Sequence, residues 1–469
     1  MSTKFQIPIE LQQLISANIA YQYRIVPSHK EHDLLYFKTD NSEMKTLQSE
    51  LKILLGFSLV LVEETKDNMN SWLSTNYRKG IDNKVSNIHY STDFLEKILI
   101  TAKEIGSSDI HFEPYENKAR VRFRLDGKLK EQFHIATDDY PIIVNKIKIR
   151  AQLDISEKRL PQDGRITIIT ELEDFDIRVS IMPTLHGEKI VLRLLSKNSD
   201  SVDLKTLGFT DDELKLYLEG IKKPNGIVLI SGPTGSGKTT TLYATLKNLN
   251  HPNTNILTVE DPIEYTLEGI NQVQLKENIG LDFAATLRTF LRQDPDIIMV
   301  GEIRDVETAN MAIRAALTGH LVLSTIHTNS AWATISRLID MGIPSFLIAS
   351  TLNISIAQRL VRQLCNACKK ESTVSKVVFP IGFEIPKNLT HHYEAVGCQH
   401  CYHTGYTGRK AIYEILLIDK ELMTSIKNNQ LTIDDYLETK KIQTLKKNAT
   451  NLIQEGTTSI EEVFSLLMD

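Results

Sequence analysis

The spacing of apolar residues changes along the chain and predicts regions of different structure. From Thr92 to Ile105 apolar residues recur at helical spacing, whereas segments 119–125 and 175–181 alternate polar and apolar residues. Alternation predicts strands of a sheet with one buried face. The pair Asp126-Gly127, directly after the first of these strands, is typical of a tight hairpin. We therefore predict an α+β domain over residues 89–198.

After Leu204 the predicted strands become continuously apolar and alternate with helical segments. These strands are 226–230, 255–259, 296–300 and 320–325. Continuous apolar strands joined by helices indicate a buried parallel sheet, so we predict an α/β domain over residues 206–469. Its last part contains a cysteine-bearing insert at 360–415 and a charged helical tail at 416–469.

The N-terminal region has a weaker pattern. Residues 1–75 mix helical spacing with short strand-like pieces, which predicts a small α/β domain. The polar run from Thr65 to Asn87 is typical of a linker, which we place at 76–88. A second short linker is expected at 199–205, between the α+β domain and the α/β domain.

Composition and charge narrow the class of protein. A chain of 469 residues is too long for one core, so we expect several domains. Its net charge is −5 and it has no extended basic block, so we expect no nucleic-acid partner. Its apolar runs are shorter than the roughly 20 residues that span a bilayer, and the first residues lack a signal-peptide pattern. We expect a cytoplasmic protein with peripheral membrane association only.

A glycine-rich segment directly follows the first apolar strand. It reads Gly232-Pro233-Thr234-Gly235-Ser236-Gly237-Lys238-Thr239, and a helical stretch begins at Thr240. This is the P-loop pattern in its strand–loop–helix context. Backbone N–H groups of the loop can surround phosphates, Lys238 can reach the β- and γ-phosphates, and the Thr239 hydroxyl can ligate Mg²⁺. The segment predicts a nucleoside triphosphate site, and the alternative is a glycine-rich turn that binds nothing.

Polar residues follow the next three strands. Glu260, Asp261 and Glu264 follow the second strand, Glu302 the third and His327 the fourth. Carboxylates at this edge of a parallel sheet lie where Mg²⁺ and an attacking water are expected. Gly301 occupies the position where a magnesium-binding Asp is common, which leaves Glu302 to orient the water or to hold the metal, with Glu260 or Glu264 as helpers. As the base that activates water we favour Glu302 over Glu264. His327 could sense the γ-phosphate, and the alternative is a structural histidine. For the acidic residues from Glu260 to Glu264 the alternative is a solvated acidic loop.

Several arginines could stabilise the charge that develops when a γ-phosphate is cleaved. The candidates are Arg165, Arg178 and Arg193 in the α+β domain and Arg288, Arg292 and Arg304 in the α/β domain. Single arginines on alternating strands are more often solvated or salt-bridged, so the sequence leaves both interpretations open.

All four cysteines lie in two Cys-x-x-Cys pairs, Cys365 with Cys368 and Cys398 with Cys401. Two such pairs can complete a tetrahedral Zn²⁺ shell that has no open position, so a structural zinc site is predicted. Two redox motifs or four unrelated thiols are the alternatives. Paired cysteines of this kind suit a reducing cytoplasm.

Together these motifs resemble the type II secretion and type IV pilus assembly ATPases, the GspE/PilB group. The resemblance extends from about residue 89 to the C-terminus. It rests on Arg159-Leu-Pro-Gln-Asp-Gly-Arg165, the P-loop, Glu260-Asp-Pro-Ile-Glu-Tyr, residues 291–305, residues 319–329 and the paired cysteines.

The resemblance implies a RecA-like P-loop motor domain after a PAS-like α+β domain, in a homo-hexamer that hydrolyses ATP. ATP would bind between the two domains, with Arg165 and Arg178 approaching its phosphates. The ring would dock on platform proteins at the cytoplasmic face of the inner membrane, through residues 1–75, and drive pilin or pseudopilin assembly. A nucleic-acid translocase is the alternative, which the acidic balance disfavours, and a poorly hydrolysing regulatory ring is a third reading.

Overall fold

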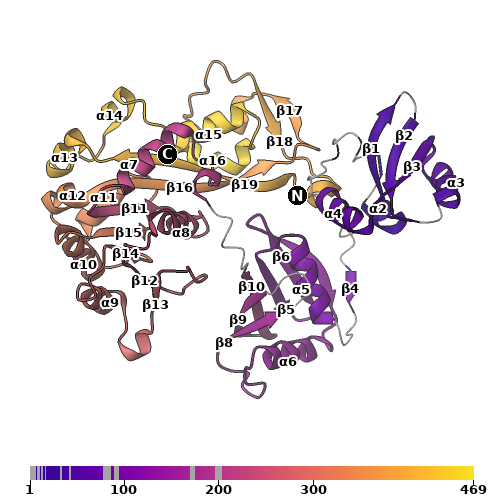
Figure 1. Cartoon of the computed structure of the whole chain (residues 1–469), viewed down its shortest axis with the longest axis horizontal. Coiled ribbons are helices and arrows are strands. Elements are labelled where there is room, and N and C mark those ends of the chain that lie inside the picture. The colour runs from indigo at the N-terminus through magenta and orange to yellow at the C-terminus, as the bar shows by residue number, and fades with distance from the viewer. Residues whose placement is uncertain are drawn as a thin grey trace. The chain divides into compact units, whose positions relative to one another are not determined.

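A computed structural model describes most of the chain (Figure 1). The described residues are 17–31, 34–41, 44–77, 86–88, 94–168, 175–195 and 203–468, with Ile7, Leu11, Leu14 and Ile15. Parts of both predicted linkers, 78–85 and 199–202, lie outside them. The chain divides into two compact units: Met1–Leu195 with Leu364–Lys370 and Glu394–Thr407, and Ser196–Gln363 with Glu371–Tyr393 and Gly408–Asp469. Each is described by itself.

The N-terminal part of the first unit contains a small sheet and helices. Its elements are α2 (Ala17–Tyr23), β1 (Ile25–Glu31), β2 (Leu34–Thr39), α3 (Met44–Leu55), β3 (Leu59–Glu63) and α4 (Lys66–Asn76). Strand β2 pairs antiparallel with β1 and parallel with β3. Helix α4 occupies the first half of the polar run from Thr65, so that half of the run is not a linker, and the linker placed at 76–88 stays a prediction. The helix begins where the Thr65 side chain accepts from the Asn68 backbone N–H, a capping signal within the polar run.

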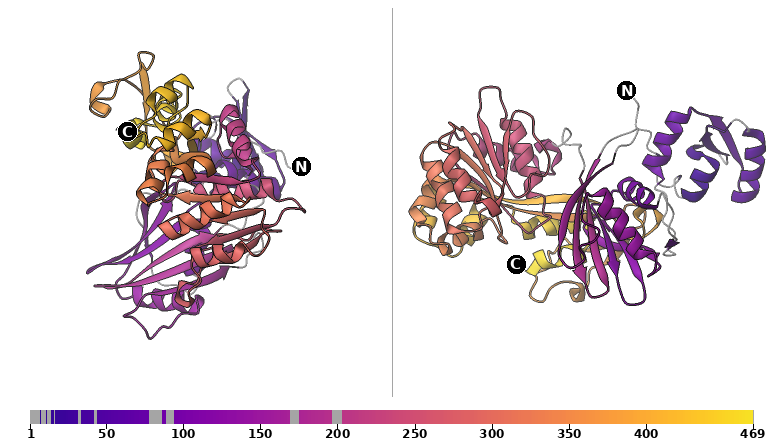
Figure 2. Two further views of the ribbon diagram at one scale, coloured as in Figure 1. Left: turned by 90° about the vertical axis from the view of Figure 1, so that its left-hand side faces the viewer. Right: turned by 90° about the horizontal axis from the view of Figure 1, so that it is seen from below.

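Residues 86–195 form the part that we call the middle domain. Its elements are β4 (Ser86–Ile88), α5 (Phe94–Glu104), β5 (Asp109–Pro114), β6 (Ala119–Leu125), β7 (Lys128–Ile135), α6 (Tyr140–Arg150), β8 (Gln162–Ile168), β9 (Phe175–Thr184) and β10 (Gly187–Leu195). The strands form one sheet in the order β4-β7-β6-β5-β10-β9-β8. Figure 2 shows this domain, coloured purple to magenta, from two further sides. Burial alternates along β6, and its buried face packs with apolar residues of α5 and α6. The predicted alternation and the Asp126-Gly127 hairpin, where both residues have positive φ, are confirmed.

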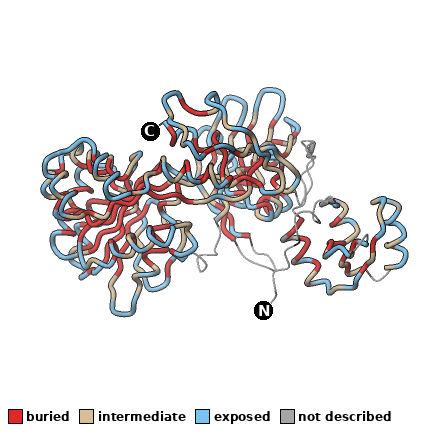
Figure 3. Tube along the Cα trace, turned by 90° about the horizontal axis from the view of Figure 1, so that it is seen from above, coloured by how far each residue is buried: buried red, intermediate tan, exposed pale blue. Residues whose placement is uncertain are grey.

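The second unit is built on a sheet with the order β13-β12-β14-β15-β11-β16-β19. The bounds are β11 (Gly226–Ser231), β12 (Ile256–Glu260), β13 (Asn271–Gln274), β14 (Ile297–Val300), β15 (Leu321–Ile326), β16 (Leu352–Leu364) and β19 (Tyr406–Leu417). From β13 to β16 every neighbouring pair is parallel. Every residue of β11, β12, β14 and β15 is buried, as the continuous apolar runs predicted (Figure 3).

Helices accompany this sheet, and we call residues 203–363 the P-loop domain. Its helices are α7 (Asp211–Ile221), α8 (Lys238–Leu249), α9 (Phe283–Phe290), α10 (Val306–Leu317), α11 (Ala333–Asp340) and α12 (Ser345–Thr351). The chain then forms a two-stranded sheet of β17 (Lys370–Thr373) and β18 (His391–Glu394), and ends in α13 (Lys420–Lys427), α14 (Asp434–Thr439), α15 (Leu445–Gln454) and α16 (Ile460–Met468). Among the described helices, none is long and apolar enough to cross a membrane.

Candidate nucleotide-binding site

The P-loop connects β11 to α8 at the carboxyl end of the parallel sheet. Gly237 has φ +88° at the N-terminus of α8, a left-handed conformation that favours glycine. A Cβ at Gly232 would lie 2.5 Å from the Gln358 carbonyl oxygen. The Ser236 hydroxyl is buried and has no hydrogen-bond partner among the described residues. The loop therefore has glycines where a side chain would not fit and an unused polar group, and both fit a bound phosphate.

Lys238 lies in the P-loop and is 8% exposed. Its Nζ donates to the carbonyl oxygens of Gly232 at 2.7 Å and Pro233 at 3.0 Å. Burial lowers the pKa of Lys238, and Arg359 adds to this effect while Glu302 opposes it. The ammonium is thus held against the loop that would surround a phosphate.

Glu302 is the second residue after β14 and lies between the side chains of Arg304 and His327. Arg304 donates a hydrogen bond to its Oε1, and His327 Nε2 lies 3.3 Å from its Oε2. Burial alone would raise the pKa of Glu302, but Arg304 and His327 outweigh it, so the pKa lies below the ordinary value. The structure therefore brings together Glu302 and His327, and it keeps Glu302 ionised.

At position 301, where a magnesium-binding aspartate is common, the backbone packs closely against the end of β12 and favours glycine. A Cβ there would lie 3.3 Å from the Val259 carbonyl oxygen and 3.5 Å from the Glu260 Cα. The Gly301 N–H also donates to that carbonyl at 2.8 Å. Since the backbone lies this close to the end of β12, a side chain at 301 would displace its neighbour by a few tenths of an ångström.

The three acidic residues at the end of β12 and in the segment after it have different environments. Glu260 is 3% exposed, and its carboxylate accepts from Tyr243, Thr258 and, at 3.1 Å, Gln272. Asp261 lies 3.7 Å from Arg304, and the Glu264 backbone N–H donates to the Tyr243 hydroxyl at 3.3 Å. The Asp261–Pro262 peptide bond is cis. Glu260 thus already accepts three hydrogen bonds from this chain, whereas Asp261 belongs to the polar group around Arg304 and Glu302.

The oxygen donors required by Mg²⁺ are present at the start of α8 and the end of β14. Thr239 is exposed in the first turn of α8, and Glu302 is ionised. A hydroxyl and carboxylates are the ligands that Mg²⁺ takes beside substrate phosphates. The donor set therefore fits a magnesium ion, with Thr239 and Glu302 as the residues that would hold it.

Two residues of β16 at the P-loop were missed by the sequence reasoning. The Gln358 side chain contacts the loop and α8, while Arg359 Nη2 donates to the Asn329 carbonyl at 2.9 Å. Neither lies in a recognised nucleotide motif. Only the parallel pairing of β16 with β11 brings them to the loop, and the sequence carries no signal for that pairing.

Arg165 and Arg178 belong to the first compact unit, and the P-loop belongs to the second. They are paired across β8 and β9, and Arg178 is in turn paired with Arg193 on β10. Arg165 also forms an ion pair with Asp176. The structure thus groups three of the candidate arginines on one sheet, and their approach to a nucleotide stays a prediction.

The four cysteines come together in one cluster. The sulfur atoms of Cys365, Cys368, Cys398 and Cys401 all lie within 4.8 Å of one another. The backbone N–H groups of Gly397 and Gly405 donate to Cys368 Sγ at 3.3 Å and Cys401 Sγ at 3.2 Å. Four sulfurs at this spacing, with N–H donors that favour thiolates, fit the predicted tetrahedral zinc site.

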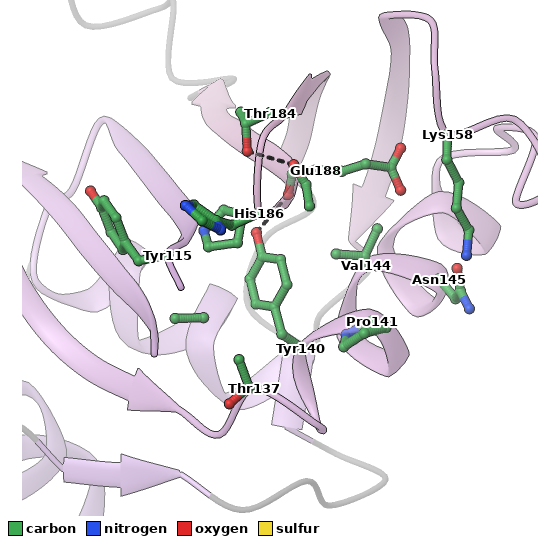
Figure 4. A pocket seen from close by; sticks show the side chains of 13 residues that line it. Tyr115, Thr137, Tyr140, Pro141, Val144, Asn145, Lys158, Thr184, His186 and Glu188 are labelled. Atoms are coloured by element: carbon green, nitrogen blue, oxygen red, sulfur yellow. Dashed lines mark hydrogen bonds between the residues drawn. The ribbon is translucent and has the colours of Figure 1, made fainter. Parts of the chain in front are cut away.

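A cavity of about 190 Å³ lies in the middle domain, between α6 and the turn from β9 to β10 (Figure 4). Tyr140 on its wall donates to the Glu188 carbonyl at 2.7 Å, and Thr184 donates to the Gly187 carbonyl at 2.6 Å. Lys158 and His186 also line it. None of the predicted nucleotide-binding residues lines this cavity, so it is separate from the phosphate site.

Comparisons with known proteins agree with these motifs. The family model "Type II/IV secretion system protein" matches residues 87–465. The type IV pilus assembly ATPase PilB of Myxococcus xanthus is 49% identical over 372 residues, covering 78% of this chain and 66% of that relative. The type II secretion system protein E of Pseudomonas aeruginosa is 46% identical over 373 residues, which cover 79% of this chain and 74% of that relative. This chain thus spans just under two thirds of the first relative's length.

A solved structure with a similar fold is the pilus retraction motor PilT with bound ADP. It is 27% identical, with a TM-score of 0.53, and the match covers 79% of this chain and 95% of that one.

Proposed function

Because the chain belongs to the type II/IV secretion system protein family, we propose that it is an ATPase motor that powers assembly of a type IV pilus or a type II secretion pseudopilus. One observation carries the enzymatic part of this proposal. A complete P-loop with a buried Lys238 lies on the strand-end edge where β14 places an ionised Glu302.

The proposed reaction is ATP + H₂O → ADP + phosphate, and the residues divide its tasks. Backbone N–H groups from Gly232 to Thr239 and the Lys238 ammonium bind the phosphates and stabilise charge on the γ-phosphate oxygens. A Glu302 carboxylate oxygen accepts the proton of the attacking water. His327 and Arg304 orient that carboxylate and keep it ionised, and Glu264 is the second candidate for the base.

Magnesium would neutralise phosphate charge at this site when bound by Thr239, and Glu302 would be its second ligand if Glu264 is the base. We assign Zn²⁺ to the four cysteines as a structural ion, because four sulfurs leave no position for water or substrate. The remaining parts of the proposal follow the family: a homo-hexamer in the cytoplasm, RecA-like and PAS-like domains that hold ATP between them, Arg165 and Arg178 approaching the phosphates, and residues 1–75 docking on inner-membrane platform proteins.

The enzymatic proposal is tested by measuring ATP hydrolysis by the purified chain. We expect Lys238→Ala and Glu302→Gln each to lower kcat by about 100-fold or more, since each removes a group that acts on the transition state. Lys215→Ala, on the exposed face of α7, is the matched control and keeps the wild-type rate. An unchanged rate in Lys238→Ala would disprove the P-loop assignment.

The same assay in the presence of DNA separates the motor from a nucleic-acid translocase. We expect no stimulation, because the chain has a net charge of −5. A rate that rises with DNA would favour the translocase instead.

A further inference from the structure

Both glycines that define the P-loop face the same residue of β16. A Cβ at Gly232 would lie 2.5 Å from the Gln358 carbonyl oxygen, and a Cβ at Gly237 would lie 2.9 Å from the Gln358 side-chain Nε2. The two glycines are thus required where the loop passes over Gln358. In this chain the shape of the loop depends on one neighbouring residue as well as on its own backbone.

The Gln358 side chain joins the loop to the helix that follows it. Its Nε2 donates to the Ser236 carbonyl at 2.9 Å, and its Oε1 accepts from the Thr241 hydroxyl at 2.9 Å. Gln358 is 2% exposed and Thr241 is fully buried. Both ends of the amide are therefore used, one on the loop and one on the first turns of α8.

The sheet register explains why residue 358 reaches this point. Parallel pairing matches Ile230 with Ile356 and Ser231 with Ala357, so Gln358 lies beside Gly232 where β11 ends. Because β16 continues for several residues beyond this point, Gln358 is held on a regular strand while the loop is not. A residue on a regular strand can thus hold the loop beside it.

We propose that Gln358 is a positioning residue that holds the P-loop in its phosphate-binding shape. The hydrogen bond to the Ser236 carbonyl turns that carbonyl toward β16, and because a trans peptide is planar the Gly237 N–H then points to the opposite side, where it can meet a phosphate. Gln358 itself makes no contact with the nucleotide. This inference rests on the proposed function and adds to it the residue on which phosphate affinity depends.

The test is direct binding of ADP and of adenosine to Gln358→Met, a change of similar size that removes both hydrogen bonds. We expect Kd for ADP and KM for ATP to rise about tenfold, the effect of losing one or two buried hydrogen bonds, with a smaller change in kcat. Adenosine binding should not change, since adenosine has no phosphate. Gln363→Met, the same change farther along β16, is the matched control and keeps wild-type binding.

Two further variants keep the inference testable if Gln358→Met folds poorly. Gln358→Glu can still accept from Thr241 but cannot donate to Ser236, so it should also weaken ADP binding. Thr241→Val combined with Gln358→Met should bind ADP no more weakly than Gln358→Met alone, because both changes break one network.

The outcomes separate this inference from the proposed function. A wild-type chain that binds no ADP would overturn both. Wild-type binding of ADP with equal binding by Gln358→Met and Gln358→Glu would overturn the role of Gln358 alone. Equal weakening of ADP and adenosine, or additive effects in the double variant, would also overturn it, because a general structural loss would then explain the data.

Discussion

Arg304 and His327 determine the pH range in which Glu302 can act as a base. Burial alone would raise the pKa of Glu302, and the contacts with Arg304 and His327 hold it below the ordinary carboxyl value. A base with a lowered pKa stays deprotonated at lower pH, so the acid limb of the activity profile should lie at low pH.

We therefore expect Arg304→Ala to move the acid limb of the ATPase profile toward higher pH. The guanidinium of Arg304 lowers the pKa of Glu302 and burial raises it, so removing the guanidinium raises this pKa. The measurement is kcat/KM for ATP across the acid range, with Arg288→Ala, on an exposed part of α9, as the control. An acid limb that does not move in Arg304→Ala would contradict a base at Glu302.

The sequence could predict some of these residues and not others. The P-loop has a fixed spacing, and Glu302 and His327 end predicted strands, so all could be named in advance. Gln358 could not, because its contact with Ser236 depends on the pairing of two strands far apart in the sequence. The three hydrogen bonds that Glu260 accepts were likewise unpredictable, since Tyr243 and Gln272 lie on different elements.

Helix α6 contains a lysine that is fully buried. Lys148 Nζ lies 2.6 Å from Glu188 Oε1 on β10 and donates to the Glu157 carbonyl at 2.7 Å. Glu157 belongs to the loop that leads into β8, where Arg165 lies. The ion pair thus ties a helix, a strand and a loop together inside the middle domain.

Lys148→Met should lower the free energy of unfolding by about 3–5 kcal/mol, because Glu188 is left buried without its cation. Lys146→Met, on the same helix and partly exposed, should cost far less. Urea denaturation measures both, and Lys148→Met with Glu188→Gln should recover part of the loss. Equal costs for the two lysines would contradict the importance of the buried pair.

The middle sheet also has a buried carboxylate, Glu113, on β5. It accepts from Arg122 at 2.7 Å and Arg120 at 3.0 Å, and Lys189 lies 3.2 Å away. Burial raises the pKa of Glu113, but the three cations outweigh burial and lower it to about 2. A carboxyl whose folded-state pKa is depressed stabilises the fold above its unfolded-state pKa and loses that contribution as pH falls.

We expect the stability of the chain to decrease between about pH 4.5 and pH 2 in part through Glu113. Glu113→Gln should be less stable than wild type at pH 6, and the difference should shrink as pH approaches 2. Denaturation of the two proteins across this range is the measurement. A difference that stays constant with pH would show that Glu113 is not the titrating group.

At the scale of whole elements, the sequence predicted those strands whose pattern of apolar residues follows directly from which faces are buried. The strands β6, β11 and β14 were predicted because alternation or continuous apolarity reflects one or two buried faces. Helix α4 was missed because its polar residues resemble a linker. Its cap at Thr65 and the burial of Met69 and Leu73 were the signals that could have identified it.

At the scale of the whole molecule, a late segment of the chain completes the middle domain. Residues 394–407 belong to the same compact unit as residues 1–195. Tyr402, next to Cys401, is part of the apolar cluster of the middle domain, and Lys130 on β7 donates to its carbonyl. Hydrophobic patterning could not predict this, because it does not say which domain a segment packs against.

Removing the proposed zinc should therefore loosen the middle domain. We expect Cys398→Ser, or a strong chelator, to release zinc and to increase hydrogen exchange in β7, where Lys130 donates to Tyr402. Exchange in β11 and β15 is the internal control and should change little. Retention of one zinc per chain in Cys398→Ser would contradict the four-sulfur site.

The position of Tyr402 also matters while the chain is being made. Domains fold as units during synthesis, at roughly 5–20 residues per second, and Tyr402 emerges about 200 residues after β10. For some tens of seconds the nascent middle domain has its sheet and helices but lacks one buried aromatic side chain and the cysteine segment around it. The P-loop is therefore synthesised before the middle domain is complete. The last contacts of the middle domain form only after residues 394–407 have been synthesised.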